Sequence, residues 1–419
     1  MMKKLCLFLL FCAAVCQLHS RELQIIATCD MHGNLSGFAR MLPVIQQYPD
    51  AVKLDLGDLF QGEVLPDLLK GEPMMSALNL AKYDFFIPGN HEFELPLPQL
   101  SGLLNSFNGQ LLGQFRVPGV KILPWQLVKR NGFTLAVIGM TDNGIYRDRK
   151  IYPGLKIVPE LAAVEKAMQD IRKHKVDAVI LARHGGNYLS GMTLGRFLRK
   201  YPEIRLVICG HSHQEIPGQR SGRTMIVQPG AHCASAVLVT LRKIASKELL
   251  LTGRLLRPGK LPAVEIVSLQ DDLQKKYGNI LNQTRLDFTS FEAQVDLWLK
   301  EFCTVSGADC AVIDLSPIPP GNYTLEQLLK LFAYRNQLLK LTVTTSEYAS
   351  LLREKVPSKR KRFATAAPAG RKEFTIVLDT FQFSRSKTLN RRNDFKLLPV
   401  ISRDIILKGF DDEKTLHDR

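Results

Sequence analysis

Apolar runs that end in polar residues recur along the first half of the chain. Runs at residues 23–30, 51–58, 83–90 and 132–140 predict buried strands. A stretch at 161–174 repeats apolar residues at helical spacing and leads into a further apolar run at 176–184. A second helical pattern at 193–201 precedes another run at 204–213. Strands that alternate with helices in this way predict an α/β domain.

The pattern continues with three predicted strands at 224–230, 234–243 and 247–256, and then changes. Residues 257–288 are expected to form a linker. A second unit follows at 289–419, where Phe291, Val295, Trp298 and Phe302 share one helical face. Strands are predicted at 309–315, 337–344 and 373–383, and helices at 323–332 and 346–355. This unit is expected to be a smaller α/β domain.

The first twenty residues differ from the rest of the chain. Lys3 and Lys4 precede a short apolar run, and small or polar residues follow as far as Ser20. The run is shorter than the roughly 20 apolar residues that a spanning helix needs. Residues 1–20 are therefore interpreted as a cleaved signal peptide, which predicts a secreted or periplasmic protein. Lipid attachment at Cys16 is kept as a minor alternative.

Five cysteines remain beyond this leader, and an odd number leaves at least one of them without a partner in the same chain. Cys29 and Cys209 end apolar runs and are expected to be small buried hydrophobic residues. Cys303 and Cys310 flank a turn-like segment, and the sequence leaves open whether they form a disulfide.

The formal net charge is +16, and much of the excess lies in residues 355–362 and 385–392. A solvated loop is the preferred interpretation of the first of these segments, with weak contact to an anionic surface as the alternative. No specific nucleic-acid partner is expected.

Polar side chains stand where the predicted strands end. They are Asp30, His32, Asp58, Asn90, His91, His184, His211 and His213. Ligands of open α/β sheets bind outside the carboxyl ends of the strands, so these groups are expected to converge. The two-residue spacing of His211 and His213 would point both rings the same way from an extended segment. Imidazole and carboxylate ligands suit zinc, iron or manganese.

Five short blocks resemble a known family. The blocks are DMHG, GDLFQG, GNHEFE, RHGG and GHSH, all between Asp30 and His213, and the resemblance spans residues 24–256. They resemble the calcineurin-like metallophosphoesterases, and GDLFQG and GNHEF are similar to the secreted 5′-nucleotidase branch. The resemblance implies a four-layer αββα metallophosphoesterase domain at 21–256. The C-terminal unit resembles the second domain of that branch only in part, because DLSPIPPGN stands where an arginine that contacts phosphate is usual.

The resemblance also implies a set of ligands for two divalent metal ions, of zinc, manganese, iron or a similar element. Asp30, His32 and His213 would bind the first ion, Asn90, His184 and His211 would bind the second, and Asp58 would bridge them. Two ions about 3.5–4 Å apart would hold a bridging hydroxide that attacks phosphorus.

The same resemblance gives His91 a catalytic role beside Asn90. Its imidazole would donate to a phosphate oxygen or to the leaving group. Glu94 would orient this ring, and it occupies a position where the branch usually carries aspartate.

The leading hypothesis is a secreted dinuclear-metal phosphohydrolase of small phosphoesters, with nucleotides among the candidate substrates. One alternative is a related hydrolase of a phosphodiester or a sulfur ester. Another is a non-catalytic protein that binds polyanions on the same fold. The complete ligand set favours an enzyme, whereas the sequence leaves open the substrate, the metal and the oligomeric state.

Overall fold

The computed structural model describes residues 22–402, apart from 143–154, 187, 190–191, 245–247, 284, 289, 325, 328–335 and 357–359. The predicted signal peptide and Cys16 lie outside the described residues. Within this described part of the chain, no helix combines the length and the apolar character needed to cross a membrane.

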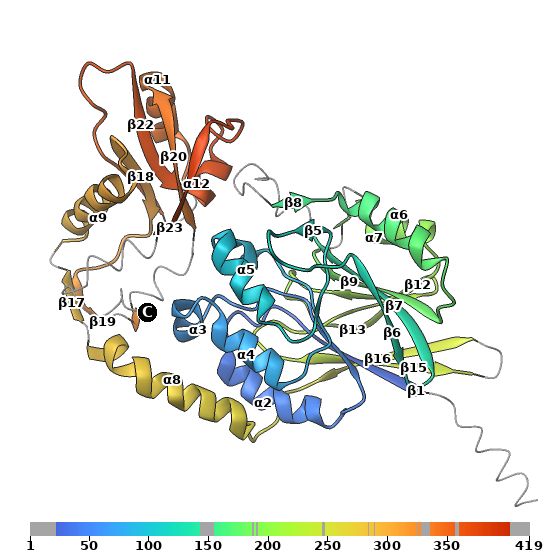
Figure 1. Cartoon of the computed structure of the whole chain (residues 1–419). Coiled ribbons are helices and arrows are strands. Elements are labelled where there is room, and N and C mark those ends of the chain that lie inside the picture. Colours follow the sequence, from blue (N-terminus) through green and yellow to red (C-terminus); the bar gives the residue numbers. More distant parts are fainter. Residues whose placement is uncertain are drawn as a thin grey trace, which may run out of the picture.

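Two six-stranded sheets form the N-terminal part of the structure (Figure 1). In spatial order, the first contains β16 (Leu249–Leu256), β15 (Ala236–Lys243), β1 (Glu22–Thr28), β2 (Val52–Asp55), β3 (Phe85–Phe86) and β4 (Gln110–Leu111). The second contains β13 (Ile216–Ser221), β14 (Thr224–Gln228), β12 (Ile204–Cys209), β9 (Ala178–His184), β7 (Phe133–Thr141) and β6 (Trp125–Arg130). β1, β2 and β3 are parallel, as are β7, β9, β12 and β14.

Helices cover the outer faces of the two sheets. The N-terminal helices are α2 (Leu35–Gln46), α3 (Val64–Leu68), α4 (Glu72–Leu80), α5 (Leu97–Asn105), α6 (Glu160–Ile171) and α7 (Leu194–Lys200). Alternate residues of β7 show the layering: Leu135 and Val137 pack between the sheets, whereas Ala136 and Ile138 pack against α6 and α7. α2, α4 and α5 pack against the first sheet. The helix–sheet–sheet–helix order confirms the predicted four-layer α/β fold.

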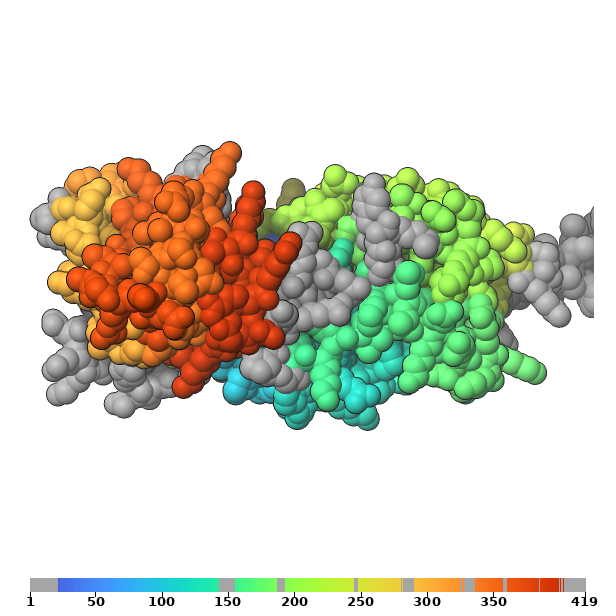
Figure 2. Space-filling model, turned by 90° about the horizontal axis from the view of Figure 1, so that it is seen from above, coloured from blue at the N-terminus to red at the C-terminus, as the bar shows by residue number. Residues whose placement is uncertain are grey.

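The C-terminal part has its own sheet, in the order β21 (Lys361–Ala364), β18 (Cys310–Leu315), β22 (Glu373–Asp379), β20 (Gln337–Thr344) and β23 (Phe395–Ile401). α9 (Phe291–Ser306) packs on one face of this sheet, and α11 (Thr345–Arg353) and α12 (Thr380–Arg385) pack on the other. The C-terminal unit lies beside the N-terminal layers in Figure 2. A smaller α/β unit was expected here, and this is confirmed.

The segment that joins the two parts is largely helical. α8 (Val264–Gln283) runs along α2, and it is followed by β17 (Arg285–Phe288), which pairs with β19 (Gly321–Thr324). Two further short sheets have two strands each, β5 (Phe115–Arg116) with β8 (Lys156–Ile157), and β10 (Tyr188–Leu189) with β11 (Met192–Thr193).

Several local predictions need correction. β3 is much shorter than the predicted strand at 83–90. The chain leaves the sheet after Phe86 and turns toward η1 (His91–Glu94). The predicted strand at 373–383 ends at Asp379, whose side chain accepts a hydrogen bond from the backbone N–H of Gln382 and caps α12. Most of the helix predicted at 323–332 lies outside the described residues.

The basic segment at 355–362 is not entirely a solvated loop. Lys361 and Arg362 belong to β21, and the Arg362 guanidinium makes two hydrogen bonds of 2.7 Å to the buried Asp314 carboxylate. Cys29 and Cys209 are buried, as predicted. Cys303 and Cys310 are free thiols in this structure.

Candidate metal centre

The carboxyl ends of five strands, β1, β2, β3, β9 and β12, bring all seven predicted metal ligands to one edge of the two sheets. Asp30 and His32 follow β1, Asp58 follows β2, and His184 is the last residue of β9. His211 and His213 follow β12, and Asn90 precedes η1. The two histidines after β12 are not extended as predicted, because both adopt left-handed backbone angles.

One group of side chains surrounds Asp30. The backbone N–H of His211 donates to both Asp30 oxygens, at 3.1 and 2.9 Å. The His213 Nε2 atom lies 3.5 Å from Asp30 Oδ1 and 3.1 Å from His32 Nε2. The side-chain amide of Gln61 lies 3.0 Å from His32 Nδ1, so that the Nε2 atom of this ring faces His213. The side chains of Asp30, His32 and His213 therefore lie close enough together to share one ion.

A second group surrounds Asn90. The Asn90 Oδ1 atom lies 3.1 Å from His184 Nε2 and 2.9 Å from His211 Nδ1. His184 Nε2 lies 3.3 Å from Asp58 Oδ2. His184 Nδ1 donates to the Leu56 carbonyl at 2.6 Å, which leaves Nε2 without its proton when the ring is neutral. A backbone carbonyl that holds the other ring nitrogen is a usual partner of a metal-binding histidine.

Asp58 belongs to both groups and is almost completely buried. Burial would raise the pKa of its carboxyl, but His184 and His91 hold that pKa below its usual range. Burial also lowers the pKa of His184, yet the Asp58 charge outweighs it and raises this pKa to about 9. A proton and a metal ion compete for the same Nε2 atom, so a bound cation would take the place of that proton. Burial lowers the pKa of His32 to about 4, which favours the neutral, ligating ring.

His91 stands beside these groups with a carboxylate behind it. His91 Nδ1 lies 2.5 Å from Glu94 Oε1 across the first turn of η1. Burial lowers the pKa of His91, but Glu94 and Asp58 more than compensate and raise it to about 10. The ring is then an imidazolium at neutral pH. The backbone N–H of His91 donates to Asp58 Oδ1 at 2.9 Å, which holds this residue next to the metal cluster.

Glu92, to which the sequence assigned no role, is fully buried in this site. Its carboxylate accepts backbone hydrogen bonds from Asp58 at 2.9 Å, Leu59 at 2.7 Å and Gly89 at 2.6 Å. The loop that carries Asp58 is thereby bonded to the loop that carries Asn90. No spacing in the sequence reveals this role, because two of the donors lie more than thirty residues away.

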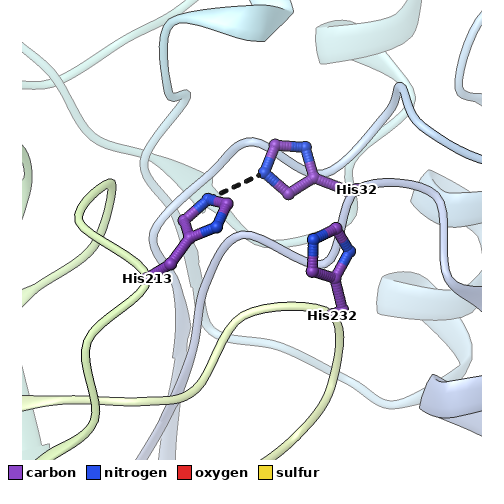
Figure 3. A group of neighbouring side chains, drawn as sticks. All are labelled: His32, His213 and His232. Atoms are coloured by element: carbon purple, nitrogen blue, oxygen red, sulfur yellow. Dashed lines mark hydrogen bonds between the residues drawn. The ribbon is translucent and has the colours of Figure 1, made fainter. Parts of the chain in front are cut away.

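His232 is a second residue that the sequence reasoning missed. Its ring lies 5.0 Å from the ring of His32 and 5.6 Å from the ring of His213, measured between centroids (Figure 3). A signal was present, because His232 follows the apolar strand β14 by a few residues. The rule that found the other polar residues at strand ends would have found this one.

Comparison with known proteins agrees with this geometry. The profile of the calcineurin-like phosphoesterase family matches residues 23–215. This segment includes β1, β2, β9, β12 and all the predicted ligands that follow them. The chain therefore contains a calcineurin-like phosphoesterase domain.

Relatives in sequence cover this part of the chain. The trifunctional nucleotide phosphoesterase protein YfkN of Bacillus subtilis is 27% identical over an alignment of 247 residues, and this match covers 47% of this chain and 17% of that protein. Protein UshA of Escherichia coli is 30% identical over 142 residues, 32% of this chain and 26% of UshA. The chain thus matches well under half the length of these relatives.

Solved structures with the same fold cover both parts of the chain. The 5′-nucleotidase precursor of Thermus thermophilus superimposes with a TM-score of 0.63 at 16% identity, covering 93% of this chain and 96% of that one. The sulfate thiohydrolase SoxB of a Thermus species gives a TM-score of 0.56 at 16% identity, covering 89% and 80%. At such identities the likeness concerns the fold alone.

Proposed function

We propose that this protein is a metal-dependent phosphohydrolase that acts on small phosphoesters at the Asp58 cluster. The observation that carries the proposal is the position of Asp58, whose carboxylate lies in one group with Asp30 and His32 and in another with His184 and His211. A shared carboxylate between two sets of nitrogen and oxygen ligands is suited to hold two divalent cations. Such a pair supplies a water of lowered pKa and neutralises charge on a phosphoryl group.

The residues of this chain have separate tasks in the proposed reaction. Asp30, His32, Asp58 and His213 would hold one ion, and Asp58, Asn90, His184 and His211 the other. The His91 imidazolium would donate its Nε2 proton to a phosphate oxygen or to the departing oxygen, while Glu94 holds Nδ1. A positive charge aimed at the place where negative charge develops stabilises the transition state.

Nucleotides are the substrate class that we put first, because YfkN and other relatives carry nucleotide phosphoesterase and 5′-nucleotidase names. Phosphodiesters and sulfur esters are the other candidates. The test is a substrate panel on metal-loaded protein that contains an aryl phosphate, nucleoside mono- and diphosphates, an aryl phosphodiester and a thiosulfate ester.

We expect the panel to show turnover that a chelator abolishes and that Asp58→Asn lowers by at least about a thousandfold, since loss of this shared ligand disturbs both ions. His174→Ala is a suitable control, because His174 lies against Trp125 on the far side of the second sheet. Absence of turnover on every ester, with equal results for wild type and Asp58→Asn, would overturn the proposed function. Tight polyanion binding without turnover would instead support a binding protein.

We also propose export of the protein after cleavage near residue 20, with weak attraction of the basic C-terminal unit to anionic surfaces. Mass spectrometry of the N-terminus of the exported protein tests the cleavage. An intact Met1 on the mature protein, or a lipid on Cys16, would contradict it.

A further inference from the structure

We propose that His232 is an additional ligand of the metal ion that Asp30, His32 and His213 bind. This inference rests on the proposed function, and it adds an imidazole to the first ion that neither the sequence reasoning nor the family resemblance assigned.

The three imidazoles of His32, His213 and His232 form one compact group. One ring nitrogen of each lies within 4.8 Å of the corresponding nitrogen of the others. Nitrogens bound to one zinc ion lie about 2.0–2.1 Å from it, so the three rings must move closer together to share an ion. Rotation about the side-chain bonds of the exposed His232 allows this approach.

The rings approach one another from separate loops, as Figure 3 shows. His32 comes from the loop after β1, His213 from the loop after β12, and His232 from the loop after β14. Since β12 and β14 are parallel neighbours, their carboxyl ends open at the same edge of the sheet. The His232 loop thus lies at the same edge of the sheet as the loops that carry the proposed ligands.

Hydrogen bonds fasten the His232 loop to the loop that carries Asp30. The backbone N–H of His232 donates to the Asp30 carbonyl at 2.7 Å. The side-chain amide of Asn34 donates to the His232 carbonyl at 2.9 Å, and its Oδ1 atom caps α2. The backbone of His232 is therefore held in place by bonds at both of its polar groups, although its ring is exposed.

His232 also shares its backbone conformation with most of the proposed ligands. His232 adopts a left-handed backbone conformation, with φ of 52°. So do five of the proposed ligands, Asp30, His32, Asp58, His211 and His213. Non-glycine residues in this conformation are unfavourable and persist where the surrounding structure holds them, most often at functional sites.

The ligand number that results has a chemical consequence. With His232, the first ion would have five protein groups, namely Asp30, His32, Asp58, His213 and His232. The second ion would have four. Five ligands exceed what a tetrahedral zinc site uses, so the first position would favour an ion that accepts higher coordination, such as manganese or iron.

The experiment compares wild type, His232→Gly, His232→Asn and His174→Ala as full chains. Glycine and asparagine both tolerate the left-handed backbone, so these variants remove the imidazole without forcing the loop to refold. Circular dichroism of the metal-free proteins checks the fold. Zinc and manganese affinities are measured by competition with a chromogenic chelator. Cobalt-loaded protein is then examined by NMR for the shifted, exchangeable N–H signals of metal-bound imidazoles.

We expect His232→Gly to weaken the binding of one of two ions by at least about tenfold, which is the loss typical even of a mutated outer partner of a ligand. Its cobalt spectrum should lack one shifted imidazole signal, and added imidazole should restore affinity by entering the vacated space. His174→Ala should match wild type in every measurement.

Unchanged affinities and an unchanged cobalt spectrum in both His232 variants would overturn this inference and leave the proposed function intact. A raised KM of the His232 variants with normal metal binding would also overturn this inference and leave the proposed function intact, since His232 would then contact the substrate and not the metal ion. A wild-type chain that binds no divalent ion would overturn the proposed function together with this inference.

Discussion

At the scale of single residues, the contact between His91 and Glu94 distinguishes the candidate catalytic group from the ligands around it. The His91 ring is held by a carboxylate at 2.5 Å, whereas one ring nitrogen of each of His32, His184 and His211 faces another group of the metal cluster. Glu94 makes this contact with the longer arm of a glutamate. Both residues lie in the same 3₁₀ turn.

Replacing Glu94 with glutamine tests this assignment. The amide keeps the shape but loses the negative charge that raises the pKa of His91 and orients the ring. We expect turnover to fall by about 10- to 100-fold, which is at or below the lower end of the rate enhancement that general acid–base catalysis supplies. Metal content, measured by atomic emission, should stay at the wild-type value.

Glu94→Asp is the matched control, because it preserves the charge on a shorter arm. It should retain more activity than the glutamine variant. Loss of metal from Glu94→Gln would show that Glu94 supports a ligand and not the His91 ring.

At the scale of elements, close backbone contact between two loops sets the geometry of the centre. Gly57 has a φ of 81°, and a Cβ atom there would lie 2.0 Å from the backbone nitrogen of Gly89. The Glu92 carboxylate joins these same loops by accepting three backbone N–H groups. Contacts between the main chains of these two loops therefore position Asp58 and Asn90 relative to each other.

Replacing Glu92 with glutamine should separate the two loops. One carboxylate oxygen becomes an NH₂ group that faces backbone donors, so at least one buried N–H loses its acceptor. We expect the free energy of unfolding to fall by about 2–4 kcal/mol, since bonds to charged groups contribute about 1.5–3 kcal/mol each. Urea denaturation followed by circular dichroism measures this change.

Metal affinity should fall in the same variant, because Asp58 and Asn90 lose their fixed spacing. Glu63→Gln serves as the control, since Glu63 is an exposed residue that precedes α3. If Glu92→Gln were as stable as that control and bound metal normally, the proposed link between the loops would be wrong.

At the scale of the whole molecule, the described residues form separate hydrophobic cores in the two parts of the chain. The layers of the N-terminal part enclose three apolar clusters, and the C-terminal sheet has its own clusters on its two faces. Each part contains one of the two tryptophans of the chain, Trp125 in β6 and Trp298 in α9. All the proposed metal ligands lie in the N-terminal part.

Removal of metal should consequently destabilise one part of the molecule and leave the other unchanged. A ligand present at a hundred times its Kd contributes about 2.7 kcal/mol to the folded state. For a unit of this size, that predicts a fall in Tm of about 5–10 °C. Thermal unfolding with and without a chelator is followed by fluorescence in Trp298→Phe, which reports Trp125, and in Trp125→Phe, which reports Trp298.

We expect the chelator to shift the Trp125 transition and to leave the Trp298 transition in place. Equal shifts of both transitions would show that the two parts unfold as one cooperative unit. The parts on either side of the proposed boundaries near residues 256 and 289 would then not be independent folding units.

Much of the fold follows directly from the apolar pattern, because strand and helix periodicities are local. The strands β1, β7, β9 and β12 and the helix α6 all occupy stretches where the pattern predicts them. Local pattern fails where tertiary contacts decide. The apolar residues before Gly89 suggested a longer strand, but the chain leaves the sheet after Phe86 so that its polar end can meet the Asp58 loop.

The sequence by itself determined which residue types stand at the strand ends, and imidazole and carboxylate groups are suited to binding metal ions. Its blocks therefore indicated the chemistry of the centre from spacing and resemblance. Only the tertiary structure decided which side chains lie close together. It placed Asp58 in two ligand groups, hydrogen-bonded Glu92 to the loop that carries Asp58, and brought the ring of His232 next to that of His32. The physical reason is that parallel strands distant in the sequence end at one edge, where loops meet through contacts that no local pattern encodes.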